Sequence, residues 1–267
     1  MKLMLSEPVY GEGPRQHWPW LAQILKKVGQ PTTEVECVNL RHGYKVVRTY
    51  ARTYNSLQVV QRAYEAEKRG YDGFIIACAS DLGMKEARSM VDIPVVGATE
   101  ATALLACSLG YKFSVVCTDP TACSRTEALI KSYGLGDRLI GVSSPPGLTA
   151  HKNFALMAEG EEGQKKVVEA LSGEMRRAVL EDRAEAVWVS CIPSSTCVAM
   201  HGVYEVEGAP VINMFAASLK LAETLVSLKK TFGTVVCKRS VYLGPPPNWD
   251  QEIPIPLEKG IAVHSKA

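Results

Sequence analysis

Cys78 and Cys191 have the setting that best suits chemistry in this chain, because each directly follows a short apolar run and precedes a polar turn. Ser80 lies in the turn after the first cysteine, and Ser194 and Ser195 lie in the turn after the second. A turn that opens into a helix supplies unpaired N–H groups and partial positive charge, which lower a thiol pKa from its usual value of about 8.5. Both thiols are therefore candidates for proton transfer.

Two thiols on opposite sides of one tetrahedral carbon can invert its configuration. A thiolate on one side removes a proton, and a thiol on the other side delivers a proton to the opposite face. An adjacent carbonyl must acidify the carbon and loop N–H groups must stabilise the enolate, whereas no metal or cofactor is required. One cysteine at a strand end is more often small core filler, but two at equivalent positions of an internal repeat favour catalysis.

Short runs of β-branched residues alternate with amphipathic stretches along the chain, which predicts parallel strands joined by helices. The predicted strands are residues 2–5, 34–38, 73–77, 95–97, 113–118, 138–142, 186–190, 211–213 and 235–237. Residues 57–69 and 164–182 have apolar positions near helical spacing and are predicted to be helices that pack on a sheet. Cys78 and Cys191 then follow the carboxyl ends of strands, where ligands bind in open α/β sheets.

An internal repeat predicts two similar lobes with a cleft between them. The segments 71–78, 93–97 and 111–118 are echoed by 184–191, 209–213 and 232–238. We expect an α/β protein of two pseudo-symmetric lobes, each a mainly parallel sheet flanked by helices, with the active site in the cleft. Residues 1–97 plus 213–267 form lobe one, which carries Cys78, and residues 98–212 form lobe two, which carries Cys191. The Pro-rich tail after residue 243 is expected to be extended.

The composition restricts the partners and the compartment of the protein. The 267 residues include 30 Lys and Arg against 28 Asp and Glu, so electrostatics do not favour nucleic acid or an anionic membrane. The apolar runs fall far below the roughly 18 residues of a membrane helix, and the apolar start of the chain is too short for a signal peptide. We expect a cytoplasmic protein with reduced thiols that acts on a small molecule.

The remaining cysteines and histidines lack the spacing of a metal site. Neither a Cys-x-x-Cys nor a His-x-x-x-His pair occurs, so no zinc site is expected. Cys117 and Cys237 occupy the same place in a repeated Val-Val-Cys run, for which we expect inward burial. Arg48 and Arg52 share one helical face, which we interpret as a solvated surface.

The segments around the first cysteine resemble the hydantoin racemase branch of the aspartate/glutamate racemase superfamily. They are DGFIIACASDLGMKEAR (72–88), DIPVVGATEA (92–101) and YKFSVVCT (111–118), and the similarity resumes over about residues 176–191. The resemblance implies a cofactor-independent racemase and a homo-oligomer, with Cys78 and Cys191 exchanging the roles of base and acid. Its implied substrate is a 5-substituted hydantoin or a related cyclic ureide.

Two loops depart from the pattern of that branch. Hydantoin racemases usually follow the second cysteine with Ala-Gly-Met, whereas this chain has Ile192-Pro-Ser-Ser195. Their first strand normally leads into an Asn-Pro-Asn type loop, whereas this chain has Ser6-Glu-Pro-Val-Tyr10. Because both loops should touch substrate, the candidate binding residues are Glu7, Pro8, Ser80, Thr118, Ser194 and Ser195. Ser80 also suits a plain N-cap, and the Asp-Pro pair after Thr118 also suits a plain turn.

Alternatives remain open within and outside this superfamily. It also contains amino-acid racemases and maleate cis-trans isomerases, in which a cysteine adds to a double bond and both cysteines are kept. Arylmalonate decarboxylases keep one cysteine, so the pair in this chain counts against them. A two-lobed protein that only binds a small molecule is the alternative without catalysis. Its buried cysteines would react slowly with iodoacetamide, whereas a catalytic pair would include one fast thiol.

Overall fold

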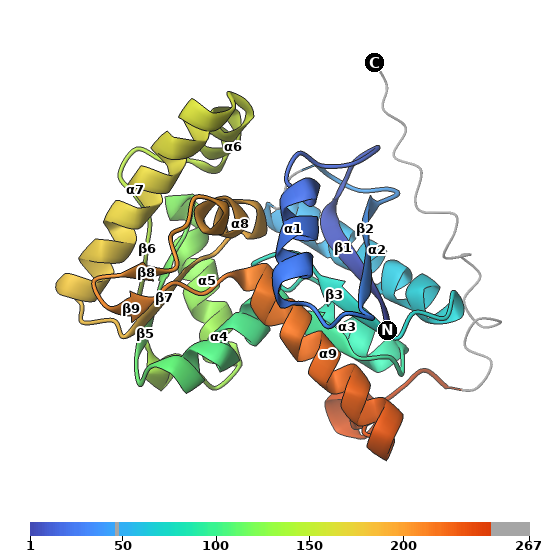
Figure 1. Cartoon of the computed structure of the whole chain (residues 1–267). Coiled ribbons are helices and arrows are strands. Elements are labelled where there is room, and N and C mark those ends of the chain that lie inside the picture. The colour runs from blue at the N-terminus through green and yellow to red at the C-terminus, as the bar shows by residue number, and fades with distance from the viewer. Residues whose placement is uncertain (46–47, 247–267) are drawn as a thin grey trace.

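The computed structural model describes residues 1–45 and 48–246, which form two parallel sheets flanked by helices (Figure 1). The first sheet has the order β2-β1-β3-β4 and the second has the order β6-β5-β7. A separate two-stranded ribbon pairs β8 with β9. The predicted α/β class with parallel sheets and flanking helices is therefore confirmed, although the proposed lobe limits at residues 97/98 and 212/213 stay a prediction.

The first sheet is built from four parallel strands whose side chains alternate between two cores. Its strands are β1 (Lys2–Tyr10), β2 (Glu34–Leu40), β3 (Gly73–Ile76) and β4 (Val95–Gly97). Leu5 and Ile75 pack towards α1 (Trp18–Val28) and α9 (Met214–Phe232). Met4 and Phe74 pack towards α2 (Thr49–Lys68) and α3 (Met84–Met90) on the opposite face. This two-residue period is the one that a sheet buried on both faces requires.

The second sheet repeats the arrangement with three strands. They are β5 (Phe113–Val116), β6 (Leu139–Ser143) and β7 (Ala186–Val189), and Val211 forms a single parallel bridge to Val187 on the outer side of β7. The flanking helices are α4 (Ala98–Leu109), α5 (Pro120–Ser132), α6 (Ala150–Ala158), α7 (Glu161–Leu180) and α8 (Ile192–Met200). The ribbon strands are β8 (Glu205–Val206) and β9 (Ala209–Pro210).

Helices α4 and α9 connect the two sheets and pack against each other (Figure 1). Helix α4 carries the chain from β4 into the second sheet, and α9 returns it to cover the first sheet. One apolar core contains Leu5 of the first sheet, Trp188 of the second and Phe215 of α9. The two sheets are therefore joined by a continuous buried core.

Two strand predictions at the C-terminal side need correction. The predicted strand 235–237 is wrong, because α9 ends at Phe232 and Gly233 turns the chain with a φ of 68°. The irregular segment that follows is held instead by Lys238, whose ammonium donates to the carbonyls of Arg88, Ser89 and Val91. The predicted strand 211–213 is reduced to the bridge at Val211, because Asn213 caps α9.

The internal repeat is real in topology but was aligned wrongly in part. The orders β2-β1-β3 and β6-β5-β7 are the same permutation, so β3 matches β7 as predicted, and β5 matches β1. The predicted match of 111–118 with 232–238 is wrong, because the latter contains no strand. Within the described part of the chain, no helix is long and apolar enough to cross a lipid bilayer. Residues 247–267, which include the second part of the Pro-rich tail, lie outside the described residues.

Candidate active site

Cys78 lies in a tight loop directly after β3. Its N–H donates to the carbonyl of Ile76 at 2.9 Å, and its Sγ accepts a hydrogen bond from the N–H of Ser80 at 3.4 Å. Gly83 shapes the far end of the loop, because its φ is 69° and a Cβ there would lie 2.7 Å from the carbonyl oxygen of Ser56. Helix α3 starts only at Met84 with Gly83 as its N-cap, so the interpretation of Ser80 as an N-cap is wrong. The thiol therefore faces a loop N–H and not a helix N-terminus.

Cys191 is the N-cap residue of α8, directly after β7. Its Sγ accepts a hydrogen bond from the Ser194 hydroxyl at 3.4 Å, and that hydroxyl accepts one from Asn153 Nδ2 of α6 at 2.9 Å. The Thr118 side chain, which follows β5, lowers the pKa of the Cys191 thiol. Two of the predicted binding residues, Thr118 and Ser194, are thus brought together at this thiol.

The two cysteines are close enough to influence each other electrostatically. Burial raises the pKa of the Cys78 thiol to about 11, and the charges of Asp81 and Cys191 act in the same direction, whereas the Ser80 N–H lowers it. Burial also raises the pKa of Cys191. The lowered thiol pKa expected from the sequence is therefore wrong, because desolvation outweighs the hydrogen bonds that favour the thiolate.

Glu7 is buried near Cys191, at the point where the pairing of β1 with β2 shifts register. Its carboxylate accepts a hydrogen bond from Trp18 Nε1 at 2.5 Å and lies 2.8 Å from His17 Nε2 and 3.7 Å from Arg15 Nε. Its negative charge raises the pKa of Cys191. The structure thus places this predicted residue next to the second thiol, within a set of cationic and N–H partners.

Pro8 and Ser195 have structural partners that do not involve either sulfur. The Pro8 carbonyl accepts a hydrogen bond from Asn55 Nδ2 at 2.9 Å, which ties this loop to α2. The Ser195 hydroxyl accepts one from the N–H of Met214 at 3.1 Å, which joins α8 to the start of α9. Ser195 is therefore turned away from Cys191, and substrate binding by these two residues stays a prediction.

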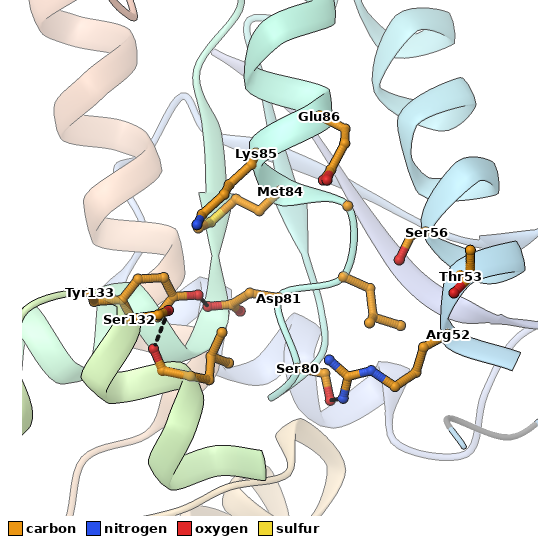
Figure 2. A pocket seen from close by; sticks show the side chains of 13 residues that line it. Arg52, Thr53, Ser56, Ser80, Asp81, Met84, Lys85, Glu86, Ser132 and Tyr133 are labelled. Atoms are coloured by element: carbon orange, nitrogen blue, oxygen red, sulfur yellow. Dashed lines mark hydrogen bonds between the residues drawn. The ribbon is translucent and has the colours of Figure 1, made fainter. Parts of the chain in front are cut away.

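Arg52 is a site residue that the sequence reasoning missed. Its Nη1 donates to the Ser80 hydroxyl at 3.2 Å, and its guanidinium is partly buried and not solvated as predicted. It lines a cavity of about 290 Å³ between α2, α3 and α5, called the α2–α5 cavity below (Figure 2). No local sequence pattern predicts this contact, because α2 and the Cys78 loop come together only in the folded chain.

Asp81 connects the Cys78 loop to α4 and to the end of α5. Its carboxylate accepts hydrogen bonds from the N–H groups of Thr99 and Glu100 at 3.0 and 2.9 Å, which caps α4. It also accepts one from the Tyr133 hydroxyl, at the end of α5, at 2.7 Å (Figure 2). Burial raises the pKa of Asp81 to about 6, although these three donors lower it. Its φ of 44° is unusual for a residue with a side chain, so the loop is held in a strained conformation.

The other cysteines fit structural roles in part. Cys117 is buried as predicted, whereas Cys237 is exposed, because the strand expected around it does not form. Across the described ranges, no group of three or more His, Cys, Asp or Glu side chains could hold a metal ion.

Comparison with known proteins places the chain in a family. A family model described as Asp/Glu/Hydantoin racemase matches residues 20–222. A hydantoin racemase of Pseudomonas sp. (strain NS671) is 32% identical over 211 residues, which cover 79% of this chain and 81% of that protein.

Two solved allantoin racemases share the fold. The one from Klebsiella pneumoniae is 23% identical with a TM-score of 0.77, and the match covers 91% of this chain and 93% of that chain. The one from Pseudomonas fluorescens is 24% identical with a TM-score of 0.77, and the match covers 92% of this chain and 98% of that chain. The family model spans both cysteine loops, and the chain therefore belongs to the Asp/Glu/hydantoin racemase family and is an isomerase of the racemase type.

Proposed function

We propose that this racemase inverts a carbon next to a carbonyl through Cys78 and Cys191, with a 5-substituted hydantoin or a related cyclic ureide as substrate. One observation carries the proposal: the two thiols follow equivalent strands, β3 and β7, and lie close enough for the charge of one to raise the pKa of the other. The similarity to a hydantoin racemase over most of the chain supports this substrate class.

In the proposed reaction, the bound enantiomer decides which thiol starts as thiolate. That thiolate removes the C5 proton, and the electron pair of the broken C–H bond moves towards the C4 carbonyl oxygen. The other thiol then gives its proton to the opposite face of C5 and becomes the thiolate. The N–H of Ser80 and the hydroxyls of Thr118 and Ser194 stabilise the charge on the sulfurs.

The test follows one enantiomer of 5-isobutylhydantoin in deuterium oxide. We expect loss of optical rotation and, at early times, deuterium at C5 of the product but not of the recovered substrate, because each thiol exchanges its own proton with solvent. Cys78→Ala and Cys191→Ala should each reduce the rate by at least about a thousandfold, since each removes an essential acid or base. The spontaneous rate, measured without enzyme, is subtracted.

Cys237→Ala is the matched control, because Cys237 is exposed and far from the described thiol loops in the sequence. Its rate should equal that of the wild type. Wild-type rates in Cys78→Ala or Cys191→Ala would overturn the two-cysteine mechanism. Turnover of maleate or of a free amino acid in place of hydantoins would replace the proposed substrate by one of the alternatives within the superfamily.

The proposal also includes the remaining expectations from the sequence: no cofactor, a homo-oligomer, and action in the cytoplasm on a small molecule. Activity that survives exhaustive chelation and gel filtration would support the first, and the mass in solution checks the second. The two-lobed binding protein that does no chemistry is set aside, because the chain belongs to a racemase family.

A further inference from the structure

The α2–α5 cavity has a polar wall that the chemistry at C5 leaves unused. Ser80 belongs both to this wall and to the Cys78 site, because its N–H donates to the sulfur at 3.4 Å and its hydroxyl accepts from Arg52 at 3.2 Å. Thr53, Ser56 and Ser132 add further hydroxyls to the wall (Figure 2). Ser80 therefore joins the cavity to the Cys78 site, and the wall of the cavity suits a polar group.

Arg52 brings a cation into this cavity without a carboxylate to balance it. Among residues 1–45 and 48–246, no carboxylate lies at ion-pair distance from its guanidinium. Partial burial lowers the pKa of Arg52, the thiol of Cys78 raises it, and the guanidinium of Arg125 on α5 lowers it. A guanidinium stays protonated in proteins, so two like charges face each other from α2 and α5.

The other charged groups around the cavity already have partners or lie elsewhere. Arg125 donates to the carbonyl of Thr121 at 2.7 Å and is close enough to Asp119 to lower its pKa. The Asp81 carboxylate is held by two helix N–H groups and by Tyr133. Lys85 and Glu86 line the cavity from α3, at its end away from Arg52 (Figure 2). Arg52 is therefore the cation at the end of the cavity beside the Cys78 loop.

We propose that the α2–α5 cavity binds the C5 substituent of the substrate and that this substituent is short and ends in a carboxylate, which Arg52 binds. The inference rests on the proposed function, because it takes C5 to lie between the two sulfurs. A carboxylate matches the planar guanidinium in a two-point hydrogen bond and balances the repulsion between Arg52 and Arg125. A bulky apolar substituent would instead remove water from the Arg52 guanidinium without replacing its hydrogen bonds.

The test compares two hydantoins that differ only at the end of the C5 substituent, 2-carboxyethyl against 2-carbamoylethyl. The wild type should show a KM at least about tenfold lower for the carboxylate, because a charged hydrogen bond exceeds a neutral one. Arg52→Gln should raise that KM about 10- to 100-fold and change the KM of the amide by less than about threefold. Arg52→Lys should restore part of the preference, since it keeps the charge but not the two-point geometry.

Arg176→Gln is the matched control, because Arg176 is an exposed arginine that pairs with Glu207 on α7 and the ribbon. It should leave both KM values unchanged. Equal KM values for the two hydantoins in the wild type would overturn the proposal. An equal fall of kcat for both hydantoins in Arg52→Gln, with a shifted pH profile, would also overturn it and would assign Arg52 to the Cys78 thiolate.

Two further measurements separate failure of this inference from failure of the proposed function. Racemisation of neutral 5-isobutylhydantoin reports the two-cysteine chemistry without the carboxylate. Calorimetric binding of the carboxylate hydantoin to Cys78→Ala, with and without Arg52→Gln, reports the subsite without turnover. The subsite is supported if the affinity for the carboxylate hydantoin falls about tenfold on Arg52→Gln and also falls with added salt. An affinity that changes with neither the substitution nor the salt overturns it.

Discussion

The loop that carries Cys78 and the loop that carries Cys191 occupy equivalent places in two sheets of the same strand order, yet they surround their sulfurs with different groups. The first sulfur accepts from a backbone N–H in a strained loop and lies near Arg52. The second caps a helix, accepts from side-chain hydroxyls and lies near Glu7. A carboxylate disfavours the thiolate at both sulfurs, Asp81 at Cys78 and Glu7 at Cys191, but the guanidinium that interacts with the Cys78 thiol comes from α2.

This difference shows that a duplicated topology does not duplicate the electrostatics. Under the proposed mechanism, the two thiols differ in how readily each becomes the thiolate, so the two directions of reaction need not have equal kcat. The enantiomers have equal free energy in water, so kcat/KM must be the same in both directions. Any difference in kcat between the two directions must therefore be matched by a difference in KM of the same factor.

The largest expected effect concerns the strain in the Cys78 loop. Gly83→Ala should lower the free energy of unfolding by about 2–4 kcal/mol, because the new Cβ meets the carbonyl of Ser56 at 2.7 Å and the φ is 69°. Gly202→Ala, just after the helix of Cys191, should cost about 1 kcal/mol, since its φ of 78° is similar but nothing lies within 4 Å. Urea denaturation measures both, and equal losses would contradict a strained first loop.

The next effect compares the larger hydrogen-bond donor at each sulfur, which is the Ser194 hydroxyl at Cys191 and the Ser80 N–H at Cys78. Ser194→Ala should lower kcat/KM about 10- to 100-fold, because it removes the hydroxyl on the Cys191 sulfur and leaves Asn153 Nδ2 with only the weak acceptor Met157 Sδ. Ser80→Ala keeps the N–H on the Cys78 sulfur and should cost less than about tenfold. Steady-state rates with 5-isobutylhydantoin measure the two losses of kcat/KM. Urea denaturation of both variants checks that neither is unfolded. The reverse order would show that the two loops do not differ in this way.

A smaller effect tests the charge beside the second thiol. Glu7→Gln should lower the pKa of Cys191, because the carboxylate that raises it becomes neutral. The rate of alkylation of Cys191 by iodoacetamide at pH 8 should rise about three- to tenfold. Cys37, whose pKa Glu7 also raises, should respond in the same direction, while Cys78 serves as the internal control. Peptide mass spectrometry assigns the alkylation rates to individual cysteines. An unchanged alkylation rate at Cys191 would show that the Glu7 charge does not influence this thiol.

The smallest effect compares two aspartates that follow strands, Asp81 and Asp119. Burial raises the pKa of Asp81 to about 6, so its unfolded form ionises first and its contribution to the free energy of unfolding falls between about pH 4 and pH 6. Burial also raises the pKa of Asp119, but the N–H of Ala150 and both donors of Thr121 outweigh it and lower the pKa overall. The stability from Asp119 is therefore present above about pH 4 and lost as the pH falls further.

Two substitutions expose this opposite dependence. Asp119→Asn should destabilise by about 1 kcal/mol at pH 7 and by less near pH 3. Tyr133→Phe removes a donor that lowers the pKa of Asp81, so the falling part of the stability curve should extend to higher pH. Urea denaturation between pH 3 and pH 8 gives both curves. If the free energy of unfolding changed with pH in the same way in both variants, the opposite pKa shifts of Asp81 and Asp119 would be contradicted.

The sequence predicted the central strands and the positions of both cysteines well, because a buried parallel strand is a short run of β-branched residues that ends at a polar turn. The run Val235–Cys237 has the same local preference but no neighbouring strand to pair with, so its propensity is not realised. The topology repeats where three strands share a core, and it stops where α9 takes over the connection.

The surroundings of the thiols were predictable only in part. Thr118, Ser194 and Glu7 were identified because they lie one to three residues from strand ends or from a cysteine. Asn153 and Arg52 were missed as site residues, since each reaches the site from a helix distant in the sequence. The direction of the thiol pKa shifts was predicted wrongly, because desolvation depends on the packed neighbours and not on the local motif.

The packing of α9 on the first sheet has a consequence for synthesis on the ribosome. The four strands of that sheet and helix α1 are complete once residue 97 has emerged, but α9, which shares one face of the sheet with α1, begins only at Met214. The side chains of Leu3, Leu5 and Ile75 are therefore only partly covered until residues 98–213 have been made. During that interval the nascent chain exposes part of an apolar sheet face, which makes this a stage at which a chaperone would protect it.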